Sequence, residues 1–162
     1  NGYVNAYRAF GEYHFLQIAL TNADFLKEKI MQDGFSLTRS YKDGVASIEG
    51  FLDDYAFTIA AFINLYQATF DETWLYTAQS LTDYVLEHFY EVAILGESPQ
   101  IIRQALDQQY LPNVLFLGGE SEGSLALLEN KLVEGQTTIY VCQNKICKMP
   151  VTQVDRALAQ IR

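Results

Sequence analysis

The chain has 162 residues, of which 49% are hydrophobic and 19% charged, enough apolar side chains for the core of one or two small domains. Its net charge of −9 argues against nucleic acid as a partner, because a phosphate-binding face needs a surplus of Lys and Arg. No apolar run approaches the roughly 20 residues that cross a bilayer and no signal peptide is visible, so no membrane partner is expected.

A repeat at an offset of 59 residues organises the first half of the chain. Residues 7–30 and 66–89 share six identical positions in 24, and a turn falls at the same place in both copies. Each copy is therefore predicted to be the end of one helix, a tight turn and a second helix.

The helices of the second hairpin differ in their apolar coverage. Residues 55–70 are apolar almost all round, which predicts a helix covered on most sides, whereas residues 72–89 are amphipathic. An inner and an outer layer of this kind predict hairpins that form a solenoid or close into an α/α toroid.

Residues 34–44 lie between the two copies and alternate apolar and polar side chains before ending in Asp43-Gly44. This pattern predicts a short strand and a hairpin turn. In a toroid, such an excursion is expected at the mouth of the cavity.

Composition and periodicity both change near residue 90. Residues 1–90 hold 19 of the 22 aromatic side chains, so we predict a helical-hairpin domain over 1–90 and a small α/β segment over 91–162. Strands are predicted at residues 92–95, 114–117 and 138–142, and helices at 99–109, 124–133 and 154–161. Alternating strands and helices favour a small, mostly parallel sheet.

The join between Tyr90 and Glu91 is unusually abrupt. No Gly, Asn or Pro ends the preceding helix, and a buried strand begins at once, although such connections usually take about 2–6 residues. We therefore predict that the natural protein has a further segment between these two residues.

Paired carboxylates at the start of the predicted inner helix are the candidate catalytic residues. Asp53 and Asp54 lie close in sequence to Arg39, Tyr41 and Tyr55, which are the candidate ligand-binding residues. Two carboxylates beside aromatic faces suit acid–base chemistry on a sugar. The alternative is that one aspartate caps the helix, the other favours its dipole, and Arg39 neutralises them.

Cys142 and Cys147 leave three interpretations open. Both thiols can simply pack, they can form a disulfide, or they can supply half of a metal site, although a Cys-x4-Cys pair without His neighbours is a weak zinc signal. Two cysteines do not make a disulfide scaffold, so a reducing, cytoplasmic location is expected. No metal and no cofactor are predicted.

Four stretches carry a resemblance to a known family: residues 39–44 (RSYKDG), 50–56 (GFLDDYA), 65–71 (LYQATFD) and 140–152 (YVCQNKICKMPVT). They resemble the C-terminal region of thioredoxin-domain-containing proteins of the YyaL and spermatogenesis-associated protein 20 type. The resemblance implies an N-terminal thioredoxin-like domain, which this chain lacks, and an α/α toroid akin to N-acylglucosamine 2-epimerases and six-hairpin glycosidases.

Together these observations predict a mainly α fold: a partial α/α toroid of the six-hairpin glycosidase-like type, followed by a small C-terminal α/β segment. The expected function is to bind or process a carbohydrate-like ligand, and a sugar-processing enzyme of the epimerase or glycosidase kind is one form of it. A non-catalytic binding or interaction scaffold is the alternative. The absent thioredoxin-like domain of the same protein is the expected macromolecular partner.

Overall fold

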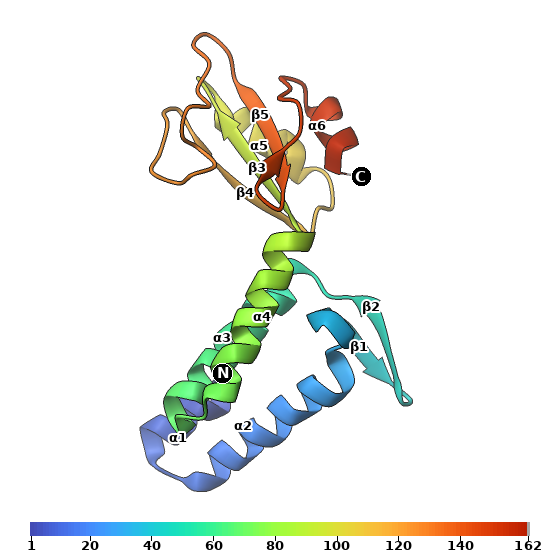
Figure 1. Ribbon diagram of the computed structural model, residues 1–162, viewed down its shortest axis with the longest axis vertical. Coiled ribbons are helices and arrows are strands. Elements are labelled where there is room, and N and C mark those ends of the chain that lie inside the picture. Colours follow the sequence, from blue (N-terminus) through green and yellow to red (C-terminus); the bar gives the residue numbers. More distant parts are fainter. Residues whose placement is uncertain (162) are drawn as a thin grey trace. The chain divides into compact units, whose positions relative to one another are not determined.

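The computed structural model describes residues 1–161, which form two compact units, one of residues 1–85 and one that begins at residue 86 (Figure 1). Each unit has its own sheet: β1 and β2 pair in the first, and β3 to β6 pair in the second. Within the described residues the α-helices are α1 (Gly2–Phe10), α2 (Tyr13–Phe25), α3 (Leu52–Thr69), α4 (Glu72–His88), α5 (Pro99–Asp107) and α6 (Val154–Ile161). The strands are β1 (Thr38–Lys42), β2 (Val45–Glu49), β3 (Tyr90–Leu95), β4 (Val114–Gly119), β5 (Thr138–Gln143) and β6 (Ile146–Cys147). A π-helical turn (η1, Leu26–Ile30) and a 3-10 turn (η2, Asp33–Phe35) follow α2.

The predicted fold class, a mainly α partial toroid, is wrong. The chain is 51% helical and 20% strand, with two sheets, and it is a mixed α/β fold. The physical reason is that two hairpins cannot close a ring, so the apolar surfaces of the helices are only partly covered by one another. Nearly half of the chain forms a second unit around its own sheet.

The two helical hairpins reproduce the sequence repeat in their turns. Gly11 ends α1 and Phe70 ends α3, and both adopt a left-handed backbone, with φ of 71° and 57°. Their amides donate to the carbonyls of Tyr7 and Tyr66, at 2.8 and 2.7 Å. Each pair is separated by the same 59 residues, so the repeat predicted in the sequence is a repeat of turn geometry as well.

The core of the N-terminal unit lies along one side of α3. Phe62 and Leu65 are buried there, and the Phe62 ring packs on Trp74 of α4 with centroids 5.4 Å apart. On the side of α1, the Arg8 guanidinium donates to Gln67 at 2.8 Å. Helix α3 therefore contacts both the first hairpin and its own partner helix.

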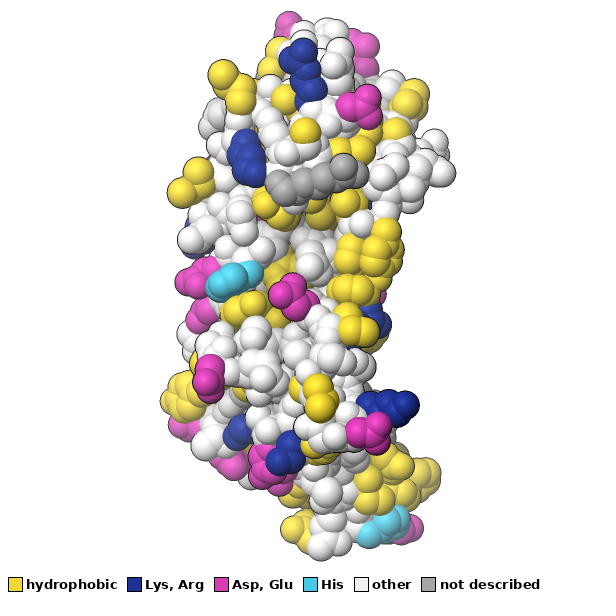
Figure 2. All heavy atoms as spheres, turned by 90° about the vertical axis from the view of Figure 1, so that its right-hand side faces the viewer, with side chains coloured by type: hydrophobic (Ala, Val, Ile, Leu, Met, Phe, Trp, Pro, Cys, Tyr) yellow, Lys and Arg dark blue, Asp and Glu magenta, His cyan; other side chains and the backbone are white. Residues whose placement is uncertain are grey.

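The expectation that α3 is an inner helix covered on most sides is wrong. Phe57 is 70% exposed and Ile63 is 37% exposed, whereas Trp74 and Leu81 of α4, expected to lie in an outer layer, are 5% and 0% exposed. Exposed hydrophobic side chains are visible on the surface among acidic and basic ones (Figure 2). Within residues 1–85 the helices are those of the two hairpins, and they leave this side of α3 exposed.

The strand excursion between the hairpins forms as predicted. β1 and β2 pair antiparallel through a two-residue turn, Asp43-Gly44. Both turn residues have positive φ, 52° and 82°, as a type I′ turn requires. Asp and Gly tolerate that conformation, so the turn chemistry sets the register of the hairpin.

The C-terminal unit is built on a four-stranded sheet with the order β4-β3-β5-β6. β3 pairs parallel with β4 and antiparallel with β5, and β5 pairs antiparallel with β6. On one face, α5 and α6 pack on a core of buried residues: Val92, Ile94, Leu106, Val114, Ile139, Val141 and Ala157. The opposite face packs Ala93 and Leu95 against Leu128, which comes from the segment between β4 and β5.

The helix predicted over residues 124–133, in that segment, is also wrong, because turns replace it. The Glu122 carboxylate accepts the amide of Leu132 at 2.9 Å, and main-chain amides around it hold its pKa below the usual range. Without a crossover helix, β5 returns antiparallel to β3. The sheet is therefore mixed, not mostly parallel, while the predicted strands near 92–95, 114–117 and 138–142 are confirmed.

Tyr90 and Glu91 are the first two residues of β3 and pair with Val114 and Leu115. The predicted additional segment between them stays a prediction, since it concerns sequence that this chain does not contain. Within residues 1–161, no helix has the length and apolar character needed to cross a membrane.

Candidate functional site

A cavity of about 410 Å³ opens between the end of α2, strand β1 and the first turns of α3. Arg39 and Tyr41 come from β1, where residues two apart share one face of the strand. Asp54 and Thr58 face it from α3, one helical turn apart, and Phe25 comes from the end of α2. The structure thus brings Arg39, Tyr41 and Asp54 together, and we call this space the Arg39–Asp54 cavity.

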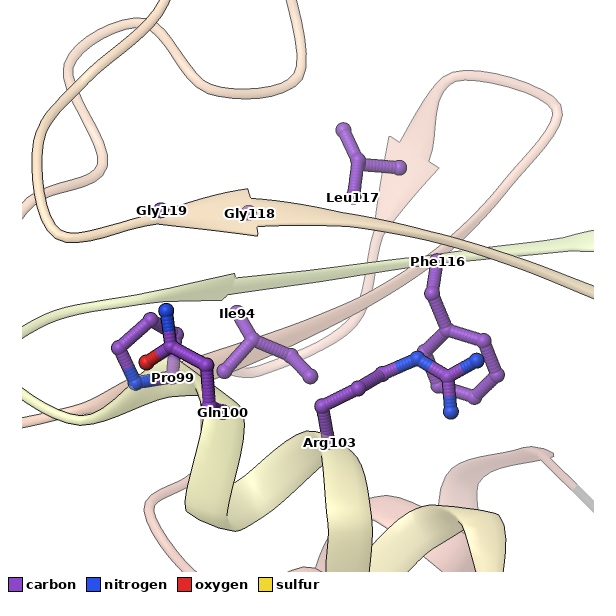
Figure 3. Close-up of a pocket in the computed structure, with 8 residues that line it drawn as sticks. All are labelled: Ile94, Pro99, Gln100, Arg103, Phe116, Leu117, Gly118 and Gly119. Carbon is purple, nitrogen blue, oxygen red and sulfur yellow. The ribbon is translucent and has the colours of Figure 1, made fainter.

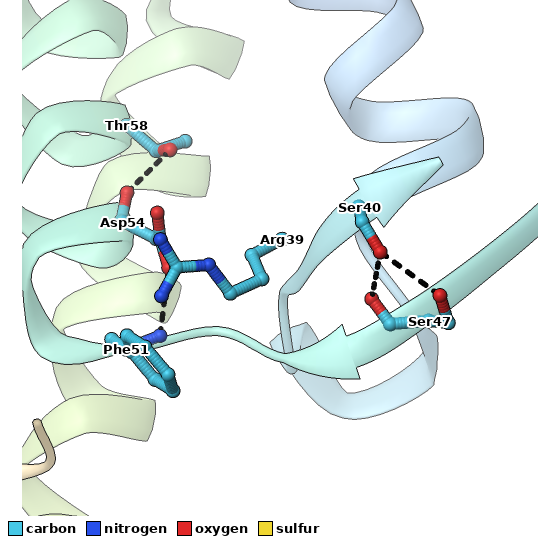
Figure 4. A network of polar contacts seen from close by, with 6 residues as sticks. All are labelled: Arg39, Ser40, Ser47, Phe51, Asp54 and Thr58. Atoms are coloured by element: carbon cyan, nitrogen blue, oxygen red, sulfur yellow. Dashed lines mark hydrogen bonds and ion pairs between the residues drawn. The ribbon is translucent and has the colours of Figure 1, made fainter. Parts of the chain in front are cut away.

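An ion pair forms the polar side of the cavity (Figure 4). Arg39 Nε lies 3.7 Å from Asp54 Oδ2, and the guanidinium stacks over the Phe51 ring at 4.0 Å. The same Oδ2 accepts the Phe51 amide at 2.8 Å, which makes Asp54 the returning member of a capping box at the start of α3. Among residues 1–161, both side-chain contacts of Asp54 use Oδ2, which leaves Oδ1 for a ligand.

Aromatic rings form the apolar side of the cavity. The Tyr41 ring meets Phe25 edge-to-face with centroids 5.3 Å apart, and Tyr41 is 37% exposed. Phe57, which lies three residues after Asp54 on α3, is 70% exposed. Sequence reasoning missed Phe25 and Phe57; the i, i+3 spacing from Asp54 was the signal available for Phe57, whereas no local signal pointed to Phe25.

The two candidate catalytic carboxylates are not brought together. Asp53 is exposed and lies outside the lining of the cavity, whereas Asp54 lines it. Adjacent residues on a helix point about 100° apart, so only one of the two faces β1. Asp54 takes the roles that the structural alternative assigned to such a residue, namely capping and pairing with Arg39.

Tyr55 lies behind the cavity and does not line it. Its side chain is 2% exposed, its ring stacks on Tyr84 at 5.5 Å, and its hydroxyl accepts the Leu37 amide at 2.8 Å. Burial raises the pKa of this hydroxyl above its usual value. Tyr55 therefore fixes the start of β1 against α3, and through it the position of Arg39.

We expect Tyr55→Phe to lower the free energy of unfolding of the N-terminal unit by about 1–3 kcal/mol at pH 7, because the buried Leu37 amide loses its acceptor. Above pH 10 the unfolded tyrosine ionises while the buried one does not, so wild-type stability falls as pH rises. The difference between wild type and variant should shrink accordingly. Denaturant titrations followed by Trp74 fluorescence at pH 7 and pH 10.5 test this, and a difference that grows with pH would contradict it.

A second cavity, of about 320 Å³, lies in the C-terminal unit between the first turns of α5 and the ends of β3 and β4 (Figure 3). Arg103 lies over the Phe116 ring at 3.8 Å and is ion-paired with Asp107. Because Asp107 already neutralises this guanidinium, the cavity makes a poor anion site. The sequence analysis did not identify it.

Cys142 and Cys147 form a disulfide that joins neighbouring positions of β5 and β6. Of the three interpretations, the structure selects the disulfide, and Cys142 is at the same time fully buried. Among the described residues no group of three or more His, Cys, Asp and Glu side chains is placed to hold a metal ion.

Comparison of the chain with protein-family models, with curated proteins and with solved structures found no match.

Proposed function

We propose that the N-terminal unit binds a carbohydrate-like small molecule in the Arg39–Asp54 cavity. The observation that carries this proposal is the placement of an Arg–Asp ion pair opposite exposed aromatic rings in one open cavity. Sugars present an apolar face of C–H groups and an edge of hydroxyls, and this cavity offers a partner for each.

The polar groups of the cavity match hydroxyl groups in kind. Asp54 Oδ1 can accept a hydrogen bond from a hydroxyl group, and the Arg39 guanidinium can donate one to a hydroxyl oxygen. The Thr58 hydroxyl donates to the Asp54 main-chain carbonyl at 2.7 Å and can accept a further hydrogen bond. Charged groups make the stronger hydrogen bonds. The volume of about 410 Å³ lies within the range of small-molecule sites.

Binding without hydrolysis fits the cavity better than glycosidase chemistry. Both retaining and inverting glycosidases ordinarily place two carboxyl groups on either side of the scissile bond. Here one carboxylate, Asp54, lines the cavity, and Asp53 is exposed outside it.

A non-catalytic interaction scaffold is the second candidate function. It is favoured by the engagement of Asp54 in the capping box and by exposed aromatic side chains, of which Phe10, Phe57 and Phe70 are 70%, 70% and 79% exposed. Under this hypothesis the Arg39–Asp54 pair is structural and no sugar binds.

Asp54→Asn separates the two candidates. Asparagine keeps an acceptor for the Phe51 amide but loses the charge that pairs with Arg39, so the helix start should survive. We expect sugar affinity to fall at least about tenfold, since hydrogen bonds to charged groups contribute about 1.5–3 kcal/mol. Titration of the chain with a panel of mono- and disaccharides, followed by NMR or calorimetry, measures this.

Asp53→Asn is the matched control, because it removes the same charge from the adjacent residue, which is exposed and lies outside the cavity. It should leave sugar affinity unchanged. Equal affinities for wild type and Asp54→Asn, or no saturable binding of any sugar by wild type, would support the scaffold instead.

The proposal also assigns the chain to the thioredoxin-domain-containing family that it resembles, on the four motif stretches that carry the resemblance, and to the cytoplasm. Residues 39–44 and 50–56 include Arg39, Tyr41 and Asp54, so two of those stretches coincide with the walls of the cavity. In a reducing compartment, disulfides are usually transient and chemically active. The Cys142–Cys147 bond is therefore expected to open and close there.

A further inference from the structure

Reactive side chains lie in a row on the face of the C-terminal sheet opposite α5 and α6. Glu91 of β3 is paired with Cys142 of β5, and Cys142 is paired with Cys147 of β6. Directly opposed residues on neighbouring strands project to the same face, so a carboxylate and two sulfur atoms are adjacent across three strands.

Lys131 brings a positive charge onto this row. Its Nζ donates to Cys147 Sγ at 3.0 Å and lies over the Tyr140 ring, 5.1 Å from the centroid. The Tyr140 hydroxyl in turn donates to the Lys131 carbonyl oxygen at 2.6 Å. Together with the bond from the Leu132 amide to Glu122, this fixes the turn that carries the ammonium.

The two sulfur atoms differ in access. Cys142 is fully buried, whereas Cys147 is half-buried at the sheet edge. In the register position opposite Cys142, Glu91 Oε2 is itself buried and accepts no hydrogen bond from the described residues. An incoming thiolate thus meets Cys147, and the inner cysteine has an unpartnered carboxylate oxygen as its neighbour.

We propose that the Cys142–Cys147 disulfide is a thiol–disulfide exchange site, reduced through Cys147 by a dithiol. Lys131 stabilises the thiolate of Cys147, and Glu91 exchanges the proton of the inner cysteine. Cationic neighbours stabilise thiolates and favour their exchange reactions. Burial lowers the pKa of the Lys131 ammonium, and the negative charge of Glu91 opposes that shift.

The exchange balances in two steps. A thiolate of the dithiol attacks Cys147 Sγ, the S–S bond breaks, and its electron pair leaves with Cys142. The Cys142 thiolate takes a proton that comes from solvent and is relayed by the Glu91 carboxylate. The second thiol of the dithiol then loses its proton to solvent. The resulting thiolate attacks the first sulfur of the dithiol, which is bonded to Cys147 in the mixed disulfide. Cys147 leaves as a thiolate beside Lys131, so two electrons pass to the protein and the dithiol becomes a disulfide.

The sheet does not depend on the S–S bond for its pairing at this edge. The Lys148 amide donates to Val141, and Ile139 and Val151 exchange two main-chain hydrogen bonds at 2.7 and 3.0 Å. The residues that follow Cys147 therefore stay hydrogen-bonded to β5 when the disulfide opens.

Pulsed alkylation of the reduced, full chain with iodoacetamide at pH 7 tests the role of Lys131. Peptide mass spectrometry should show Cys147 reacting at least about tenfold faster than Cys142. Lys131→Met should lower the Cys147 rate about tenfold, the effect of one pKa unit on the thiolate fraction. Lys131→Arg should keep most of the wild-type rate.

Lys145→Met is the charge-matched control, because Lys145 lies in the turn between the two cysteines and is exposed. It should leave both rates unchanged. Equal reactivity of the two cysteines in wild type, or equal effects of Lys131→Met and Lys145→Met, would overturn the proposal.

Trapping with oxidised glutathione is a test that does not need a Lys131 variant. The reduced Cys142→Ala chain should gain glutathione on Cys147 at least about tenfold faster than Cys147→Ala gains it on Cys142, because access differs. In the two-cysteine chain, Glu91→Gln should prolong the mixed disulfide several-fold relative to wild type and to the control Glu134→Gln. Faster labelling of Cys142 than of Cys147 would overturn the assignment.

Reduction of the native, oxidised chain identifies the source of the dithiol. Dithiothreitol and a protein dithiol of the Cys-x-x-Cys type are compared at equal thiol concentration, with folding followed by circular dichroism. Reduction by either without loss of structure supports the proposal. Faster reduction by the Cys-x-x-Cys protein identifies a protein dithiol as the source, and faster reduction by dithiothreitol identifies a small-molecule dithiol. Failure of both to reduce the folded chain overturns it.

Discussion

Gly118→Ala should destabilise the C-terminal unit by about 3–5 kcal/mol, enough to unfold a marginally stable unit. Gly118 lies in β4, opposite Ile94 of the central strand β3, and has φ of 155°. A Cβ at this position would overlap the Ile94 carbonyl oxygen. Neither backbone can move away without breaking the β3–β4 pairing, so the substitution combines an unfavourable φ with a main-chain clash.

Gly119→Ala is the matched control, because the next residue of the same strand has no positive φ. The nearest atom to its Cβ would be the Ser121 carbonyl oxygen at 3.4 Å, and we expect a change below about 1 kcal/mol. Denaturant titration followed by circular dichroism, together with hydrogen exchange of β3 and β5 amides, measures both variants. Trp74 lies in the N-terminal unit, so its fluorescence should not change with either variant. Equal effects of the two alanines on the hydrogen exchange of β3 amides would contradict the clash.

The special role of Gly118 could not be read from the sequence. Two consecutive glycines after an apolar run predict the end of a strand, and the strand does end there. What makes Gly118 different from Gly119 is the carbonyl of Ile94, 24 residues away, and the pairing of β3 with β4 brings it close. Local pattern thus placed the turn, while a long-range contact decides which glycine is essential.

The errors in the predicted fold also arise from long-range contacts, which a local sequence pattern does not show. Periodicity identified the strands and most of the helices, because apolar spacing is a local property. It did not show whether residues 124–133 would find a partner surface for a helix, and Glu122 instead holds this segment in turns. Because no crossover helix forms there, β5 pairs antiparallel with β3, and the sheet is mixed where a mostly parallel one was predicted.

The candidate site, too, could be predicted only in part. Arg39 and Tyr41 share a face because of strand alternation, and Asp54 starts α3, so their meeting was accessible to sequence reasoning. Phe25 reaches the cavity from α2, and Tyr55 turns inward to the Leu37 amide. Those two placements depend on how α2 and α3 pack, which no pattern in the sequence specified.

Phe62→Ala should lower the free energy of unfolding of the N-terminal unit by about 3–5 kcal/mol, whereas Phe57→Ala on the same helix should change it by less than about 1 kcal/mol. Phe62 is 0% exposed and packs on Trp74, so truncation leaves a cavity inside the core. Phe57 is 70% exposed and contributes its ring to the Arg39–Asp54 cavity.

The comparison of these two variants also tests how α3 is covered. In an inner helix of a toroid, both rings would be buried and both truncations would cost several kcal/mol. Here we expect Phe57→Ala to leave stability intact and to weaken sugar binding, because it removes an aromatic wall and not a core residue. Denaturant titration by Trp74 fluorescence and sugar titration of the same samples measure the two effects separately. A loss of stability from Phe57→Ala equal to that from Phe62→Ala would mean that a further surface covers α3 in solution.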